Sequence, residues 1–168
     1  MIESAISSGK TWLSESLIKA LNFHAIVGLH PQAGMYRPTE VTVGTHIPPD
    51  FWRVEALMED FVNYINRNWH DAVPSLAAYA LWRINNIHPF INGNGRTARA
   101  VCYYILCVKT GGLLPGSTIV PEILRNDPMR TPYYHALRYA DGSGDIGPLS
   151  RVVVAALARQ VGQPQPQA

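Results

Sequence analysis

The stretch HPFINGNGRTAR, from His88 to Arg99, decides the fold and the site, because it places a histidine, an Asn- and Gly-rich turn and two arginines in succession. Gly93 and Gly95 allow a tight turn that brings backbone N–H groups close to a ligand. Arg96 and Arg99 share one face of a following helix at i, i+3. The unpaired N–H groups and the positive dipole end of that helix favour a nucleotide phosphate. The stretch therefore predicts an anion site with a histidine beside it.

Two buried helices are predicted to meet at this stretch. Pro74 is favourable in the first turn of a helix, and the segment from Leu76 to Ile87 that follows it is apolar nearly all round. His88 ends this helix, because Pro89 disfavours helical geometry in the residue before it. The next helix is expected from about Asn94 to the residue before Gly111. The histidine and the Gly-Asn-Gly turn then face one pocket.

The rest of the chain predicts a mainly α-helical bundle around this pair, as a single domain over residues 1–160. Apolar residues at helical spacing predict further helices at about 11–27, 54–65, 133–140 and 148–159. The helix at 54–65 is amphipathic and is expected at the surface of the bundle. Residues 34–47 alternate in the manner of a short β-hairpin, and residues 161–168 are expected to be a disordered tail.

Composition limits the compartment and the partners. The 168 residues are 47% hydrophobic and 15% charged with a net charge of +2, which fits a globular domain and argues against a nucleic-acid partner. Cys102 and Cys107 lie five apart in an apolar helical run, so a disulfide between them is not expected. The first residues lack a signal-peptide pattern, and the longest apolar run, 100–108, is too short to span a bilayer. A cytoplasmic protein is expected, although an effector secreted without a cleaved signal would look the same.

The stretch that opens the pocket resembles the signature of the Fic domain family, the Fic/Doc-like protein AMPylators. That signature reads His, any, Phe, any, Asp or Glu, Gly, Asn, Gly or Lys, Arg, two spacers, Arg. The matching residues of this chain are His88, Phe90, Gly93, Asn94, Gly95, Arg96 and Arg99. Residues 34–49 are similar to the family's target-docking hairpin, and residues 133–149 to its closing helix and turn. The resemblance therefore covers most of the chain.

The resemblance implies a fold and an activity. The fold is a helical bundle whose two central helices are joined by the active-site loop at 88–99, with a hairpin flap at about 34–47. The activity is transfer of AMP from ATP to a Ser, Thr or Tyr hydroxyl of a target protein, with His88 as the general base. The end of the preceding helix is expected to raise the pKa of this histidine.

Nucleotide contacts are implied in the same way. Gly93, Asn94 and Gly95 would hold the α-phosphate through backbone N–H groups. Arg96 and Arg99 would bind the β- and γ-phosphates. An ordinary interhelical turn also favours Gly and Asn, but it would leave the two arginines unexplained.

Further contacts would hold the nucleotide base and the target protein. Tyr133 and Tyr134 would flank the base, although packing of an amphipathic helix explains them equally well. An extended target segment would add to the flap at its exposed edge, which carries Met35, Tyr36, Arg37 and Thr39. A homodimer is left open.

Asn92 stands where the family has the acidic residue that holds Mg²⁺ against the phosphates of ATP. Asparagine keeps an oxygen but loses the charge on which Mg²⁺ sites depend. A unit charge about 4 Å away is worth about 4 kcal/mol at an effective dielectric constant of about 20, so weaker Mg²⁺ binding is expected. Three explanations stay open: a weak but competent Mg²⁺ site, altered chemistry on another phosphate-containing ligand, and a substitution that inactivates the protein.

Two other functions are consistent with the same residues. The first is transfer of another phosphate-linked group, such as UMP, phosphate or phosphocholine. The second is a catalytically impaired nucleotide-binding module that regulates a partner, and Asn92 is its main support.

Overall fold

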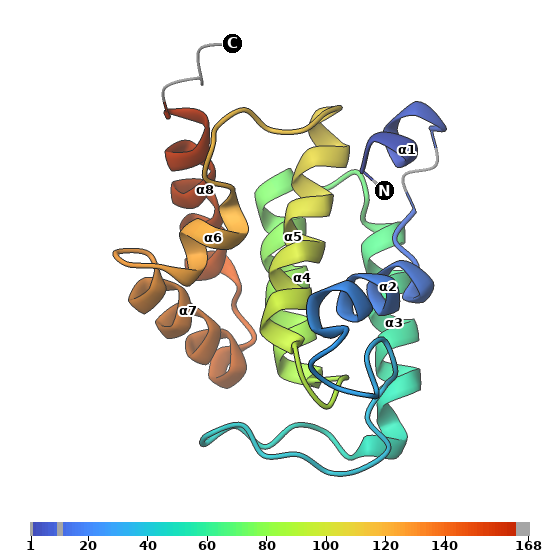
Figure 1. The fold of residues 1–168 in the computed structure, drawn as a ribbon. Helices are drawn as coiled ribbons and strands as arrows, with labels where there is room; N and C mark the ends of the chain where they lie inside the picture. Colours follow the sequence, from blue (N-terminus) through green and yellow to red (C-terminus); the bar gives the residue numbers. More distant parts are fainter. Residues whose placement is uncertain (1, 10–11, 164–168) are drawn as a thin grey trace.

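The computed structural model describes residues 2–9 and 12–163, and these residues are mainly helical, as predicted (Figure 1). Their elements, in chain order, are α1 (Ile2–Ser7), α2 (Glu15–Ile26), the 3₁₀-helix η1 (Phe51–Arg53), α3 (Val54–Arg67), α4 (Val73–Ile87), α5 (Asn94–Thr110), α6 (Val120–Arg125), α7 (Arg130–Ser143) and α8 (Gly147–Val161). In this part of the chain, β-structure is limited to two isolated bridges.

The two central helices are α4 and α5, which pack against each other more extensively than any other pair described (Figure 1). Pro74 lies in the first turn of α4, and His88 is its C-cap. Gly111 caps the end of α5 with φ 84°, a left-handed conformation that glycine adopts without strain. The predicted boundaries of both helices are thus confirmed.

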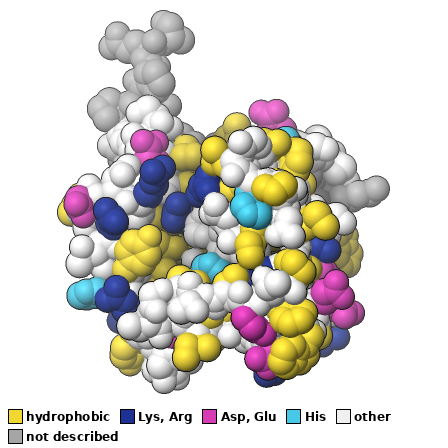
Figure 2. All heavy atoms as spheres, turned by 60° about the horizontal axis from the view of Figure 1, so that its bottom comes forward, with side chains coloured by type: hydrophobic (Ala, Val, Ile, Leu, Met, Phe, Trp, Pro, Cys, Tyr) yellow, Lys and Arg dark blue, Asp and Glu magenta, His cyan; other side chains and the backbone are white. Residues whose placement is uncertain are grey.

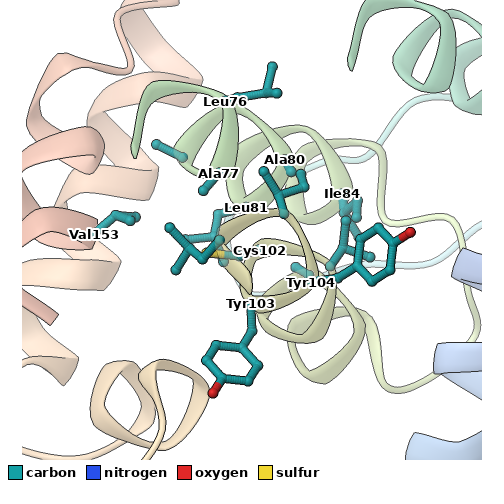
Figure 3. Packing of buried hydrophobic residues seen from close by; sticks show 14 of the residues in the cluster. Leu76, Ala77, Ala80, Leu81, Ile84, Cys102, Tyr103, Tyr104 and Val153 are labelled. Carbon is teal, nitrogen blue, oxygen red and sulfur yellow. The ribbon is translucent and has the colours of Figure 1, made fainter. Parts of the chain in front are cut away.

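Small residues of α4 allow this close approach. Ala77 and Ala80 are fully buried and lie with Leu81 among the side chains of α5 and α8 (Figure 3). Cys102 on α5 belongs to the same core, and both cysteines are free thiols, as expected from their spacing. The core therefore fixes the shared end of α4 and α5, where the motif loop connects them.

The other helices flank this pair on two sides. Helices α6, α7 and α8 lie on one side, and α1, α2 and α3 lie on the other (Figure 1). Helix α2 begins at Glu15, because the Ser14 hydroxyl caps it by accepting a hydrogen bond from Leu17 N at 3.1 Å. Thr11, the predicted start of this helix, lies outside the described residues. Helices α1 and α6 were not predicted, since six residues are too few to show helical periodicity.

The C-terminal helices depart slightly from the predicted boundaries. Helix α7 begins at Arg130 rather than Tyr133, without a side-chain cap. Helix α8 continues to Val161, so the first residue of the predicted tail is helical, and residues 164–168 lie outside the described part. Among the described helices, none combines the length and the apolar character needed to cross a bilayer.

The hairpin predicted at 34–47 is not confirmed as a two-stranded ribbon. Val43 and His46 exchange two backbone hydrogen bonds, of 3.3 and 3.0 Å, around a tight turn, but no strand forms on either side of it. Pro38 and the two prolines at 48–49 lack an N–H, so a longer ladder cannot form. The segment is instead an irregular loop that runs below the α4–α5 connection (Figure 1).

We predict that Leu81→Ala lowers the free energy of unfolding by about 3 kcal/mol, because it leaves a cavity between α4 and its neighbours. Denaturant unfolding measures the effect. Val154→Ala, at a side chain that is 48% exposed on α8, is the control and should cost less than about 1 kcal/mol. Equal losses in the two variants would contradict the central position of α4.

Candidate active site

The motif loop is closed by one side chain, Asn94. Its Oδ1 accepts a hydrogen bond from Phe90 N at 2.9 Å, and its Nδ2 donates to Phe90 O at 2.7 Å. The Phe90 ring is fully buried and lies 5.4 Å from the ring of Tyr36. The Asn94 side chain therefore shapes the loop, and only its backbone N–H is placed for a ligand.

A second asparagine, Asn22 on α2, fastens this loop to its neighbours. Its buried amide accepts from Gly34 N at 2.9 Å and donates to Asn92 O at 3.0 Å and to Thr97 Oγ1 at 3.1 Å. Sequence reasoning missed Asn22. The signal was present, because Asn22 lies midway between two buried isoleucines at i−4 and i+4 on α2, where an apolar residue is expected.

Glycine is required at position 93. Its φ is 80°, and a Cβ there would lie 2.6 Å from Ile26 Cγ2 and 3.1 Å from the Asn22 amide nitrogen. At Gly95 a Cβ would lie 3.4 Å from Arg99 Nη1. A side chain at position 95 would therefore occupy the space beside this guanidinium group.

The start of α5 offers N–H groups to a ligand. The first bond of the helix runs from Thr97 N to Gly93 O at 2.9 Å, so the N–H groups of Asn94, Gly95 and Arg96 precede the helical ladder. The N–H of Gly93 differs, because it donates to Asn92 Oδ1 at 2.6 Å. A phosphate held by all these N–H groups must displace the Asn92 side chain.

The two arginines of the motif reach a shared cavity. Arg96 donates one hydrogen bond to Ala25 O at 2.6 Å, and Arg99 is only 8% exposed. Both line a cavity of about 290 Å³ together with Arg125, which sequence reasoning missed. Within the described ranges neither motif arginine forms an ion pair with a carboxylate. Glu122 also lines this cavity but lies beyond ion-pair distance of both, so three arginines face one carboxylate there, a balance that favours an anionic ligand.

His88 adopts a left-handed conformation with φ 52° and ψ 57°, which is uncommon for a residue other than glycine. Its Nδ1 lies 3.3 Å from Asn85 O, an oxygen that can only accept, so Nδ1 donates and Nε2 keeps its lone pair. Burial lowers the pKa of His88 to about 4, against the opposing effect of the Asn85 carbonyl. The predicted rise in this pKa is therefore wrong for the ligand-free site, because desolvation outweighs the helix end.

Arg37 faces inward rather than toward a docking partner. Its guanidinium group is fully buried, with Nε donating to His88 O at 2.9 Å and the other nitrogens donating to Thr39 O and Pro49 O. Its backbone N–H donates to Pro89 O at 2.8 Å. This residue fastens the loop below the site to the backbone of the motif.

The other residues predicted to contact a base or a target differ in their access to solvent. Tyr133 is 1% exposed and lies near Arg99 and Asn85, whereas Tyr134 is 42% exposed. Tyr36 is half-buried and donates to Glu15 Oε2 at 2.9 Å. The exposed side chains of the predicted flap set are Met35 and Thr39.

The residues at the site do not fit a resident Mg²⁺ ion. Asn92 offers one neutral oxygen, and that oxygen already accepts the Gly93 N–H. No cluster of three His, Cys, Asp or Glu side chains suited to a metal occurs in the part of the chain that the structure describes. A neutral amide in place of a carboxylate is a poor ligand for this cation.

The face that carries the loop is recessed. Lys and Arg side chains gather along one side of the recess, and a histidine is visible within it (Figure 2). Three larger cavities, of about 740, 530 and 340 Å³, lie between α7 and α8, between α1 and α5, and beside α6 and the end of α8. His88 lines none of them, and it does not line the cavity of the motif arginines either. The chemistry of the motif, rather than cavity size, therefore identifies the site.

Comparison with known sequences gives a consistent result. A family model described as Fic/DOC family matches residues 12–106, more than half of the chain. "Protein adenylyltransferase Fic" of Drosophila persimilis is 33% identical over 124 residues, which make up 73% of this chain and 22% of that protein. The Drosophila yakuba protein of the same name is 35% identical over 124 residues, with coverage of 73% and 23%. The chain thus spans less than a quarter of the length of these relatives.

Solved structures agree on the fold. A fragment of Fic-1 from C. elegans superposes with a TM-score of 0.72 and 27% identity, over 94% of this chain and 46% of that one. A Fic family protein from Desulfovibrio desulfuricans G20 gives a TM-score of 0.71 over 95% of this chain and 49% of that one. Its identity of 23% supports the fold alone.

We predict that His88 stays neutral at pH 7 and takes up a proton only at about pH 4. The unfolded chain binds this proton near pH 6.5, so the free energy of unfolding should fall as the pH drops from about 6.5 to about 4. Imidazole NMR titration and denaturant unfolding at several pH values measure the two effects. His88→Gln should remove this part of the pH dependence, and an ordinary titration of His88 near pH 6.5 would contradict the prediction.

Proposed function

The chain belongs to the Fic/DOC family, and from its site we propose that it is a protein adenylyltransferase, which transfers AMP from ATP to a Ser, Thr or Tyr hydroxyl of a target protein. The observation that carries the proposal is the pair of arginines without a carboxylate partner beside the open N–H groups of α5. The names of the relatives support the same reaction.

The first step is proton removal by His88. Its Nδ1 donates to Asn85 O, so Nε2 is the basic atom, and burial keeps the ring neutral at physiological pH. Nε2 takes the hydroxyl proton of the target, and the hydroxyl oxygen forms a bond to the α-phosphorus of ATP. The bond from this phosphorus to the bridging oxygen of the β-phosphate breaks, and pyrophosphate leaves with the electron pair.

The start of α5 stabilises the charge of this reaction. The N–H groups of Asn94, Gly95 and Arg96 donate to the α-phosphate oxygens, where negative charge concentrates during transfer. The guanidinium groups of Arg96 and Arg99 bind the β- and γ-phosphates in the cavity that they share. Tyr134, the exposed member of the tyrosine pair, contacts the base.

The target protein docks beside His88 on the loop that crosses the end of α4. Met35 and Thr39 are exposed on this loop, whereas Arg37 holds its backbone against the motif. An extended target segment places its hydroxyl next to the imidazole of His88. This placement replaces a bimolecular encounter by a fixed geometry. Mg²⁺ enters as part of the ATP substrate, since the chain has no carboxylate at position 92 to hold it.

A second candidate function is a nucleotide-binding module that regulates a partner with weak or no transfer. Asn92 favours it, because its neutral side chain accepts the Gly93 N–H at 2.6 Å and so competes with the phosphate. Transfer of UMP, phosphate or phosphocholine is the corresponding alternative among enzymes. Label incorporation from each candidate donor, tested in place of ATP, distinguishes these alternatives.

We predict that incubation with α-labelled ATP and Mg²⁺ leads to labelled protein. His88→Ala should lower the rate of label incorporation about 10²–10⁴-fold, because the general base is lost. Nucleotide affinity should change little, since His88 does not hold the phosphates. His24→Ala, at an exposed histidine on α2, is the control. Equal rates for His88→Ala and the wild type would contradict the assigned role, and incorporation of label from labelled UTP or CDP-choline in place of ATP would identify another donor.

We predict that Asn92→Asp raises Mg²⁺-dependent AMP transfer at least about tenfold, because a carboxylate restores a charge near the phosphates. The measurement is the rate of label incorporation as Mg²⁺ is varied. Asn63→Asp, on the exposed side of α3, adds the same charge away from the site as a control. A rate that stays unchanged or falls in Asn92→Asp would show that position 92 does not limit the reaction.

A further inference from the structure

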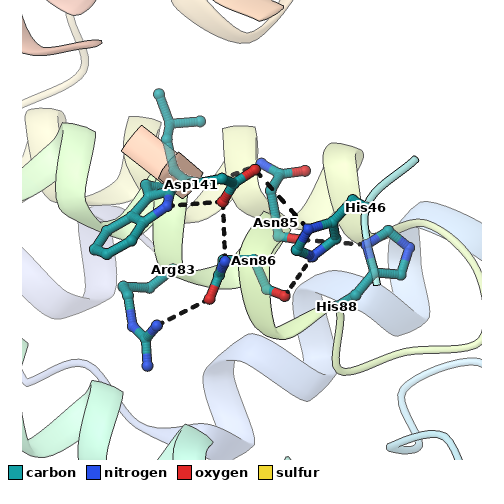
Figure 4. Close-up of polar contacts among 8 residues, drawn as sticks. His46, Arg83, Asn85, Asn86, His88 and Asp141 are labelled. Atoms are coloured by element: carbon teal, nitrogen blue, oxygen red, sulfur yellow. Dashed lines mark hydrogen bonds and ion pairs between the residues drawn. The ribbon is translucent and has the colours of Figure 1, made fainter. Parts of the chain in front are cut away.

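His46 is the second histidine near the motif, and it belongs to the loop rather than to a helix. Its Nε2 lies 2.8 Å from Asn86 O, near the end of α4, and because a carbonyl oxygen only accepts, Nε2 donates. Its Nδ1 lies 4.0 Å from Asp141 Oδ2 on α7. Figure 4 shows this imidazole between the two helices, next to His88.

The acceptor groups around His46 are held in place. Asp141 Oδ1 accepts from Trp82 Nε1 and from Asn86 Nδ2, each at 2.9 Å. Asn86 Oδ1 in turn accepts from Arg83 at 3.0 Å (Figure 4). The imidazole therefore contacts a network that already joins α4 to α7 and does not depend on the loop for its geometry.

The turn that carries His46 has little else to hold it. Residues 42–45 and Ile47 are exposed, and Ile47 reaches 86%. In the described structure, His46 alone connects residues 41–47 to the helices through side-chain hydrogen bonds or ion pairs. The other bonds of the turn run between Val43 and His46 themselves.

The position of His46 also matters for His88. The two histidines interact with consecutive carbonyls of α4, those of Asn85 and Asn86. Both His46 and Arg37 oppose a positive charge on His88. The loop thus approaches His88 at two points. Arg37 contacts the backbone of His88, and His46 lies across the end of α4.

We propose that His46 is a positioning residue that fastens the turn 42–47 across the end of α4, and so holds the target-facing loop beside His88. The fastening itself stands on the hydrogen bond of His46 to Asn86 O, and Asp141, 4.0 Å from Nδ1, adds an attraction only when the ring is protonated. Its consequence for transfer rests on the proposed function. The target would then meet a loop whose position is set by the helices of the catalytic motif.

Hydrogen–deuterium exchange of the full chain tests the fastening without any activity. His46→Ala should raise the exchange rates of the backbone amides at positions 43 and 46 about fivefold, the effect of losing roughly one hydrogen bond. The exchange rates of the amides in α4 and α5 should stay unchanged. His46→Gln, whose amide can still donate to Asn86 O, should restore most of the protection. His70→Ala, at a histidine whose side chain is 80% exposed beside Asp71, is the control.

Two results would overturn the proposal. One is exchange at the turn that is equal in His46→Ala and the wild type, and the other is exchange that rises equally in α4 and α5. Affinity for a non-hydrolysable ATP analogue, measured by calorimetry, should stay within about twofold in His46→Ala, because the phosphate site does not use the turn. Transfer from labelled ATP should fall in that variant and recover in His46→Gln. A protein that transfers no label at all would refute the proposed function and still leave the exchange result decisive for His46.

Discussion

The site depends on the two hydrogen bonds between the Asn94 side chain and the backbone of Phe90. They close the loop between α4 and α5 and anchor the Phe90 ring in the core. This closure sets the first turn of α5, and with it the direction of its open N–H groups and of Arg96 and Arg99. A change in the loop would therefore move the phosphate donors and the arginines together.

The arginines at this end of the molecule differ in whether a group of opposite charge lies beside them. Arg37 is buried, but it has carbonyl oxygens and Glu40 as partners. Arg96 and Arg99 have no carboxylate partner in the described structure, and Asn92 adds no negative charge. A polyphosphate supplies the missing charge, whereas burial keeps His88 neutral and able to accept a proton.

Much of the fold follows from local rules in the sequence. Pro74, Pro89 and Gly111 set the ends of the central helices, and apolar spacing identifies most of the others. The family resemblance identified the motif residues. Spacing marks Asn22 as a polar residue on a buried helix face. Its hydrogen-bond partners, like the inward orientation of Arg37, arise from contacts between segments far apart in the chain, which spacing cannot express. The hairpin was not confirmed, because backbone pairing within the loop stops at Val43 and His46, and Tyr36 and Arg37 pair with the motif backbone instead.

The proposed function requires that the start of α5 and its two arginines form a triphosphate site. Calorimetric titration with ATP, with inorganic pyrophosphate as competitor, measures whether this site exists. We expect binding that pyrophosphate displaces and that Arg99→Ala weakens at least about tenfold, the loss of a charge-assisted pair. Absence of ATP binding by the wild type, or equal affinity in Arg99→Ala, would contradict it.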